Sequence, residues 1–173
     1  MIKQDVERLC VTLSELQAYT RVETGDEEAL LAGLLRTASE ICERFLNQAL
    51  VSRSFEAVVR ASDGWTMLPV QPVLTISSIR RSGSTEALAP TSYRADIDFD
   101  GRGLVAGLPL DQAFVVTGTA GMANDANGIP EPIRQGILRL AAFMYANRDA
   151  QAGDMPAAVT ALWRPYRKAG LLR

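Results

Sequence analysis

Apolar residues near the N-terminus recur at the spacing of an amphipathic helix. Between Leu30 and Leu46 they fall three or four residues apart, so they line one face of a helix. The acidic residues Glu27 and Glu28 precede most of this stretch, where the dipole of a helix favours negative charge. The pattern therefore predicts a long helix over about residues 26–46.

Two short motifs in this region mark helix starts. Thr12 and Glu15 have the spacing of a capping box, in which a hydroxyl and a carboxylate each accept a hydrogen bond from a backbone amide. They predict a short helix over residues 13–20. Thr24 and Glu27 repeat this spacing in front of the longer helix.

The pattern changes after residue 50. Short runs rich in β-branched or alternating residues replace the helical spacing, and glycines and prolines separate them. The runs cover residues 51–60, 68–69, 73–80 and 114–119. We predict a small antiparallel β-region over residues 50–120.

Helical spacing returns in the segment NGIPEPIRQGILRLAAFMYANRDA, residues 127–150. Pro130 and Pro132 suit a first helical turn, whose backbone amides have no partner within the helix. Apolar residues from Ile133 onward line one face of this helix. The other face, which we expect to be free for a neighbouring molecule, carries Arg134, Gln135, Arg139 and Arg148.

These elements predict an α+β fold, namely a mainly α-helical bundle with a small antiparallel β-region inserted between the helices. A last helix is expected between Pro156 and Pro165, since proline ends a helix. The length of 173 residues suits one domain. Within residues 1–173 we expect N-terminal helices over 1–48, the β-region over 50–120, C-terminal helices over 129–164 and a tail over 165–173.

The charge balance and the composition of the chain disfavour several classes of function. The 18 basic side chains face 20 acidic ones, so the chain lacks the positive excess of proteins that wrap nucleic acid, and a DNA-binding regulator is disfavoured. Histidine, the commonest general base in catalysis, is absent from the chain.

Without histidine, Cys10 and Cys42 cannot complete an ordinary zinc site, and we expect both to be buried free thiols. We expect no catalytic residue, no metal and no cofactor.

The sequence also carries no membrane signal. No apolar run reaches the length of a membrane span, and the N-terminal residues MIKQDVERLC lack the apolar core of a signal peptide. We therefore expect a cytoplasmic protein without a membrane partner.

An acidic motif, DIDFDG at residues 96–101, matches the opening of a calcium-binding loop. The twelfth position of such a loop requires a glutamate, but Gly107 occupies it here. An acidic hairpin turn is the favoured interpretation. The alternative function that remains is a small metal-dependent hydrolase using Asp96, Asp98 and Asp100.

A glycine pair in GTAG, residues 118–121, could form a turn that holds a phosphate against backbone amides. The motif lacks the lysine and hydroxyl residue of a P-loop, and no helix is predicted directly behind it. The favoured interpretation is the exit from a strand.

The C-terminal segment WRPYRKAGLLR, residues 163–173, concentrates positive charge. It has four basic side chains and no acidic one, and Trp163 and Tyr166 lie among them. Tryptophan, tyrosine and arginine dominate the energetics of protein interfaces. Two interpretations stay open, since the segment could contact a partner or pack back on its own domain.

The motifs occur in an order that resembles one known family. They are TLSEL, GDEEALL, LPVQPVLTISSI, VTGTAGM, IPEPIRQGILRLAAFMYANRDA and PAAVTALWRPYR. Together they resemble the head-to-tail connector, or adaptor, proteins of tailed bacteriophages and gene transfer agents. The chain departs from the family pattern at Met122, where an aromatic residue is common, and at Phe143 and Met144, where a polar or aromatic pair is common.

The resemblance implies a non-enzymatic structural protein of a virion or gene transfer agent particle. Such adaptors form a homo-oligomeric ring, usually of twelve copies, beneath the portal protein. The ring connects the capsid to a stopper or other neck or tail protein, and DNA passes through its channel only as cargo. The particle would assemble in the bacterial cytoplasm, and the protein would end in its neck.

The resemblance also implies a place for the portal contact. In several members of the family the C-terminal segment reaches the portal, which assigns Trp163, Arg164, Tyr166 and Arg167 to that contact. Tyr145 and Arg148, at the end of the preceding helix, belong to the most specific part of the resemblance. We expect these two to act as a structural latch and to contribute to the portal or subunit interface.

Overall fold

The computed structural model describes residues 2–4, 9–22, 25, 27–148 and 154–168. Its α-helices are α1 (Leu13–Thr20), α2 (Glu28–Leu46), α3 (Glu131–Ala146) and α4 (Ala157–Trp163). Its strands are β1 (Ile2–Gln4), β2 (Arg53–Arg60), β3 (Thr66–Met67), β4 (Val73–Arg81), β5 (Arg94–Ile97), β6 (Gly103–Ala106) and β7 (Ala113–Ala120). Its short 3-10 helices are η1 (Pro90–Ser92), η2 (Ala126–Gly128) and η3 (Arg164–Tyr166).

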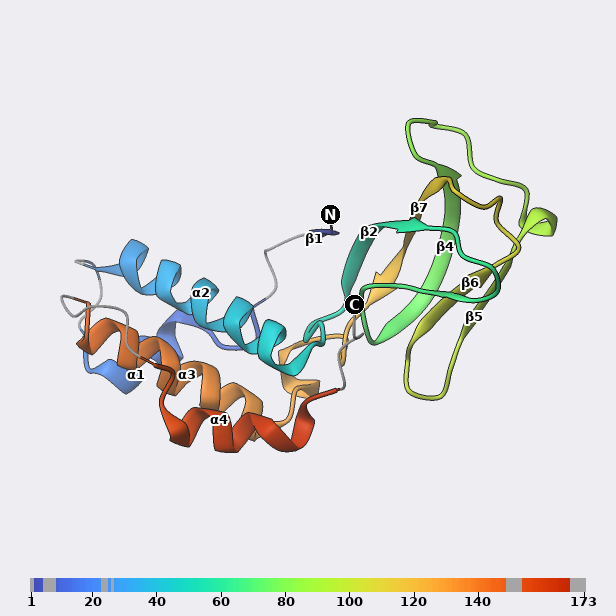
Figure 1. The fold of residues 1–173 in the computed structure, drawn as a ribbon. Helices are drawn as coiled ribbons and strands as arrows, with labels where there is room; N and C mark the ends of the chain where they lie inside the picture. The colour runs from blue at the N-terminus through green and yellow to red at the C-terminus, as the bar shows by residue number, and fades with distance from the viewer. Residues whose placement is uncertain (1, 5–8, 23–24, 26, 149–153, 169–173) are drawn as a thin grey trace.

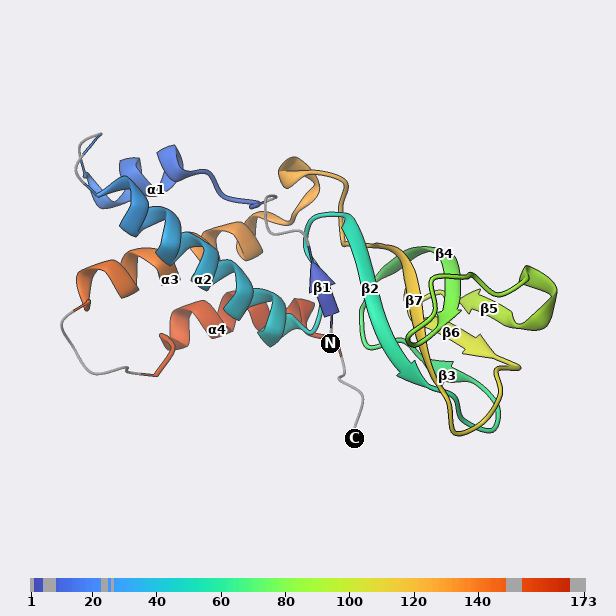
Figure 2. The ribbon, with the colours of Figure 1, turned by 90° about the horizontal axis from the view of Figure 1, so that it is seen from above.

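The helices gather at one end of the molecule and the strands at the other (Figures 1 and 2). We call the first group, α1 to α4 with η3, the helical part, and the strands with their loops the β part. Each part has its own cluster of buried apolar side chains. The chain therefore has two cores that meet at a junction.

Helices α2 and α3 run antiparallel and form the centre of the helical part (Figure 1). Their apolar faces meet through residues such as Leu35, Cys42 and Ile137, all of which are buried. The start of α1 has the predicted capping box, because Thr12 accepts from the Glu15 amide and the Glu15 carboxylate accepts from the Thr12 amide. The spacing of apolar residues thus accounts for α2 and α3, and the capping box accounts for the start of α1.

Both sheets of the β part are antiparallel. The larger has the order β1-β2-β7-β4, and the smaller has the order β3-β6-β5. In β2 the side chains of Phe55, Ala57 and Val59 are buried while Val58 between them is exposed, as expected of a sheet with one face on a core. The second core therefore lies on one side of the larger sheet.

A partly buried ion pair holds the junction between the two parts. Glu43, near the end of α2, binds Arg53 at the start of β2 through two contacts of 2.8 and 2.5 Å. The same carboxylate accepts a hydrogen bond from the Leu50 amide at 2.9 Å. Gly121 passes so close to this connection that a Cβ atom on it would lie 2.4 Å from Ser52 Cα. The segment that joins α2 to β2 is therefore held by hydrogen bonds and by close backbone packing.

The structure corrects the predicted fold class. It is a mixed α+β fold, and the expected mainly helical bundle is wrong because helices make up well under half of it. The prediction missed β1, β5 and β6, and the run at residues 68–69 follows β3 instead of forming a strand. Strand β5 gave no apolar alternation because three of its four residues are exposed.

Two smaller predictions need adjustment. Helix α2 begins at Glu28, and Thr24 and Asp26 of the second proposed helix start lie outside the described residues. The side chain of Glu27 does not cap α2. Pro165 does end the last α-helix, but the chain continues as the 3-10 turn η3.

Candidate interaction surface

The described residues contain no group of three or more histidine, cysteine, aspartate or glutamate side chains placed to hold a metal ion. Over the same residues, no helix has both the length and the apolar character that crossing a membrane requires.

The acidic motif forms the turn between β5 and β6, as the favoured interpretation predicted. Asp98 Oδ1 accepts hydrogen bonds from the amides of Asp100 at 2.9 Å and Arg102 at 2.8 Å. Asp100 pairs with Arg102 at 3.2 Å and with Lys168 at 3.3 Å. Asp96 Oδ1 accepts a hydrogen bond from the Ile97 amide at 2.9 Å. All three carboxylates are thus engaged by amides or cations, and the metal-dependent hydrolase is not supported.

The glycine motif lies at the end of β7 and serves strand packing. A Cβ atom at Gly118 would lie 2.0 Å from the Thr75 carbonyl oxygen, where β4 is irregular opposite β7. Gly121 makes the close approach to Ser52 at the junction. Both glycines are explained by neighbouring backbone, so the exit from a strand is the interpretation that fits.

Both cysteines are free and buried in the helical core, as predicted. Burial raises the pKa of the Cys10 thiol to about 11 and raises the pKa of Cys42 further. A thiol with a raised pKa carries little of the reactive thiolate at neutral pH. These residues therefore behave as small apolar side chains.

Tyr145 and Arg148 both bind Glu27, which precedes α2. The Tyr145 hydroxyl donates to Glu27 Oε2, Arg148 Nη1 lies 2.7 Å from Oε1, and the Arg148 guanidinium lies 5.2 Å from the centre of the Tyr145 ring. The Tyr145 hydrogen bond and then Arg148 hold the pKa of Glu27 below its ordinary value. We call these three residues the latch, because they tie the end of α3 to the start of α2.

The polar face of α3 is partly occupied within the chain, which corrects in part the expectation that it is free. Arg134 Nη2 pairs with Glu15 of α1 at 2.6 Å, and its Nε donates to the Cys10 carbonyl oxygen at 3.0 Å. Gln135 donates to Glu131 on the same helix at 3.1 Å. Arg139 is exposed. Arg134 therefore holds α1 against α3, and only part of this face is free.

Trp163 lies in the helical core, which corrects its assignment to the surface contact. Its side chain is 0% exposed, its indole Nε1 donates to the Ile133 carbonyl oxygen at 3.2 Å, and its ring lies 5.8 Å from that of Phe45. Gly136 of α3 makes room for it, since a Cβ there would lie 2.0 Å from Nε1. Trp163 thus anchors the C-terminal segment.

The rest of this segment runs along the end of α2. Gln48 Nε2 donates to the Tyr166 carbonyl oxygen at 2.5 Å, and the Lys168 amide donates to the Leu46 carbonyl oxygen at 3.0 Å. The Arg167 guanidinium lies 5.5 Å from the centre of the Phe45 ring. Up to Lys168 the segment packs on its own chain, while the side chains of Arg164 and Arg167 stay exposed.

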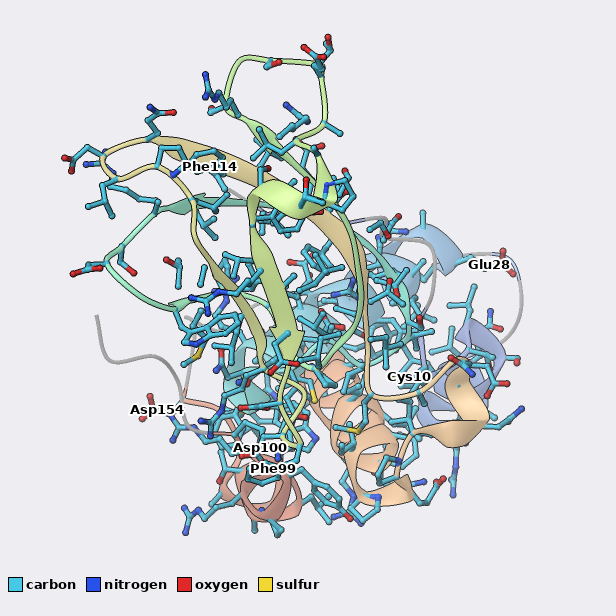
Figure 3. All side chains as sticks on the ribbon, turned by 90° about the vertical axis from the view of Figure 1, so that its right-hand side faces the viewer. Cys10, Glu28, Phe99, Asp100, Phe114 and Asp154 are labelled. Atoms are coloured by element: carbon cyan, nitrogen blue, oxygen red, sulfur yellow. The ribbon has the colours of Figure 1, made fainter. Side chains whose placement is uncertain are left out.

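Phe99 was not singled out by the sequence prediction. Its side chain is 97% exposed at the tip of the β5–β6 hairpin, next to Asp100 and at the opposite end of the β part from Phe114 (Figure 3). The available signal was an aromatic residue in the middle of DIDFDG, a turn whose other residues are mostly polar or glycine.

Solved structures resemble the chain over nearly its whole length, whereas no protein-family model and no curated protein matches it. One similar chain belongs to the neck of an empty gene transfer agent particle computed with C6 symmetry. It is 26% identical, with 99% of this chain and 97% of that chain covered and a TM-score of 0.77.

Two further structures agree with it. A chain in the virion of the native gene transfer agent particle gives the same identity, coverage and TM-score. A chain in the neck of the native particle, computed with C12 symmetry, is 25% identical at the same coverage, with a TM-score of 0.76. The protein is therefore similar along its length to chains of gene transfer agent particles, two of them from structures of the particle neck.

Proposed function

We propose that this protein is a structural subunit of the neck of a gene transfer agent or related phage-like particle. Within that neck it acts as the head-to-tail adaptor, a ring beneath the portal that joins the capsid to a stopper or other tail protein. The observation that carries the proposal is the similarity to chains of such necks over 99% of this chain. It assembles in the bacterial cytoplasm as part of the particle.

The geometry is compatible with a structural role. The polar clusters that could suggest chemistry have structural partners, as in the acidic turn and the latch. A closed ring needs two different surfaces on each subunit, because one side of a copy meets the other side of the next. The two parts of the chain, joined by the Glu43–Arg53 pair, offer such distinct surfaces.

The portal contact in this proposal centres on the exposed end of the C-terminal segment. Arg164 and Arg167 are exposed, and Tyr166 is partly so. Trp163 supports the contact from the core by fixing α4 against α2 and α3. The latch of Glu27, Tyr145 and Arg148 holds the other end of α3 and so keeps the helical part rigid when the portal docks.

DNA in this proposal passes through the ring without being held. The chain has two more acidic than basic side chains (20 against 18). Strong binding of phosphates requires many basic contacts and would resist movement of the DNA. Near-balanced charge therefore suits a channel that lets DNA slide.

Electron microscopy of the protein mixed with its cognate portal tests the proposal. The expected product is a ring of the protein stacked coaxially on the portal. A double variant, Arg164→Glu with Arg167→Glu, is expected to lose portal binding. The variant Arg60→Glu with Arg81→Glu makes the same charge change at exposed positions of the β part and serves as the control. Absence of any portal-bound ring with the wild-type chain would contradict the proposal.

A further inference from the structure

Phe99 stands apart from the other exposed apolar side chains of the described residues. Its exposed fraction is 97%, whereas the next largest value among the large apolar side chains is 55%, at Leu110. Isolated apolar side chains on a surface are common, but they are usually covered in part by their neighbours. An aromatic ring that contacts almost nothing in its own chain gains the most from burial against another molecule.

The turn that carries Phe99 is held in one conformation. Asp98, directly before Phe99, accepts hydrogen bonds through Oδ1 from two amides that follow Phe99, those of Asp100 and Arg102. The Gly101 amide also donates to the Asp98 carbonyl oxygen at 2.9 Å. Gly101 has a φ of 77°, a value that glycine adopts without strain. The ring is therefore presented on a preorganised turn, which lowers the entropic cost of binding.

The same turn is fixed to both parts of the molecule. The Val73 amide at the start of β4 donates to the Gly101 carbonyl oxygen at 2.7 Å. On the other side, Lys168 of the C-terminal segment pairs with Asp100 at 3.3 Å. The turn that carries Phe99 thus contacts the helical part as well as the β part. A side chain placed in this way can define the angle between two rigid molecules.

We propose that the Phe99 hairpin, residues 96–102, docks on the adjacent copy of this chain and forms the apolar anchor of the contact between neighbouring subunits of the ring. This inference rests on the proposed function. Similar chains occur in necks computed with C6 and C12 symmetry, and in such a ring every copy meets a second copy. The contact is heterologous, so Phe99 enters a different surface of the next copy.

Photo-crosslinking tests this contact in assembled particles. A benzoylphenylalanine is placed at position 99 in cells that produce the particles, and a second strain carries it at Leu110, the next most exposed apolar position. Irradiation of purified particles is expected to give a covalent dimer of this chain from position 99, at several times the yield from position 110. Crosslinks from position 99 only to the portal, a tail protein or DNA, or no crosslink at all, would overturn the inference.

A substitution series measures the strength of the contact. Phe99→Ser is expected to raise the concentration needed for half-maximal ring assembly on the portal by at least about tenfold, the range of an interface hot spot. Phe99→Leu retains an apolar anchor and should stay within about threefold of the wild type. Leu110→Ser is the matched control. Because Phe99 contacts little in its own chain, these variants should keep the wild-type circular dichroism spectrum.

The results separate this inference from the proposed function. If the wild-type chain forms rings and Phe99→Ser forms them equally well, the hairpin contact is wrong while the proposed function stands. If the wild-type chain is missing from particles that contain heads and tails, the proposed function is wrong and the inference falls with it.

Discussion

One aromatic side chain of the helical part and one of the β part lie in opposite environments. In the helical part, Trp163 is 0% exposed and its indole nitrogen has a partner in the core. In the β part, Phe99 is 97% exposed on a turn held by Asp98. The helical part also uses its arginines to join distant elements, as in the Glu15–Arg134 pair. The difference teaches that a cluster of basic and aromatic residues in the sequence does not show which of its side chains are exposed: Trp163 is buried, whereas Arg164 beside it is exposed.

Removing the tryptophan of the helical part should have the largest effect on stability. Trp163→Ala deletes a fully buried side chain above Gly136 and is expected to lower the free energy of unfolding by about 3–5 kcal/mol. Urea unfolding followed by circular dichroism measures this change. Arg164→Ala, at the exposed neighbouring position, should change stability by less than about 0.5 kcal/mol. Equal losses in the two variants would mean that Trp163 is not a core residue.

Breaking the junction should uncouple the two parts. Glu43→Gln replaces the carboxylate that pairs with Arg53, whose side chain is 10% exposed, by a neutral amide, and the expected loss is about 1–3 kcal/mol. Calorimetry is expected to show that the single unfolding transition broadens or splits in two. Glu40→Gln changes an exposed carboxylate on the same helix and is the control. A variant that unfolds like the wild type would show that this ion pair does not hold the parts together.

Two glycine-to-alanine substitutions compare how well each part of the molecule tolerates an added methyl group. Gly118→Ala brings a Cβ against the Thr75 carbonyl oxygen in the β part and should cost about 1–3 kcal/mol of stability. Gly33→Ala in α2 meets nothing within 4 Å and should stabilise by about 0.8–1 kcal/mol, because alanine favours a helix. Denaturant midpoints of both variants measure the effects. The same sign for the two would contradict this account of close strand packing.

The latch should give the smallest effect, visible only in acid. The pKa of Glu27 in the folded chain lies below its ordinary value of 4.5, so the latch contributes stability above that pH and loses it as the pH falls through the folded-state value. The melting temperature of the wild type should therefore fall more steeply between about pH 5 and pH 3 than that of Glu27→Gln. Glu28→Gln, one residue away and exposed, should keep the wild-type slope. Identical slopes in all three proteins would remove the latch from the account.

The helices could be predicted closely because their signals are local. Apolar spacing and cap residues placed α1 at its observed bounds and α2 within two residues at its start. The strands β5 and β6 were missed because one is mostly exposed and the other has only four residues, so neither shows a clear alternation. Hydrogen bonds to a partner strand, which the local sequence does not show, create these two elements.

The candidate surface could be predicted only in part. The acidic turn was recognised from its residues. The burial of Trp163 could not be recognised in this way, because it depends on the space above Gly136, which lies 27 residues earlier in the chain (163 less 136). The binding of Glu27 by Tyr145 and Arg148 joins residues more than a hundred positions apart. Pairings of this kind arise from the packing of α2 against α3. A glycine inside an otherwise strong helix was the one sequence signal for the tryptophan site.

The central claim is that the protein is a ring subunit of the particle neck, and electron cryomicroscopy of intact particles tests it most directly. The map is expected to show a closed ring of this chain between the portal and the tail, with the twelvefold symmetry used for a similar neck. The helical part and the β part should fit its density as one unit. A neck that is complete without density for this chain, in particles made by cells that express it, would contradict the claim.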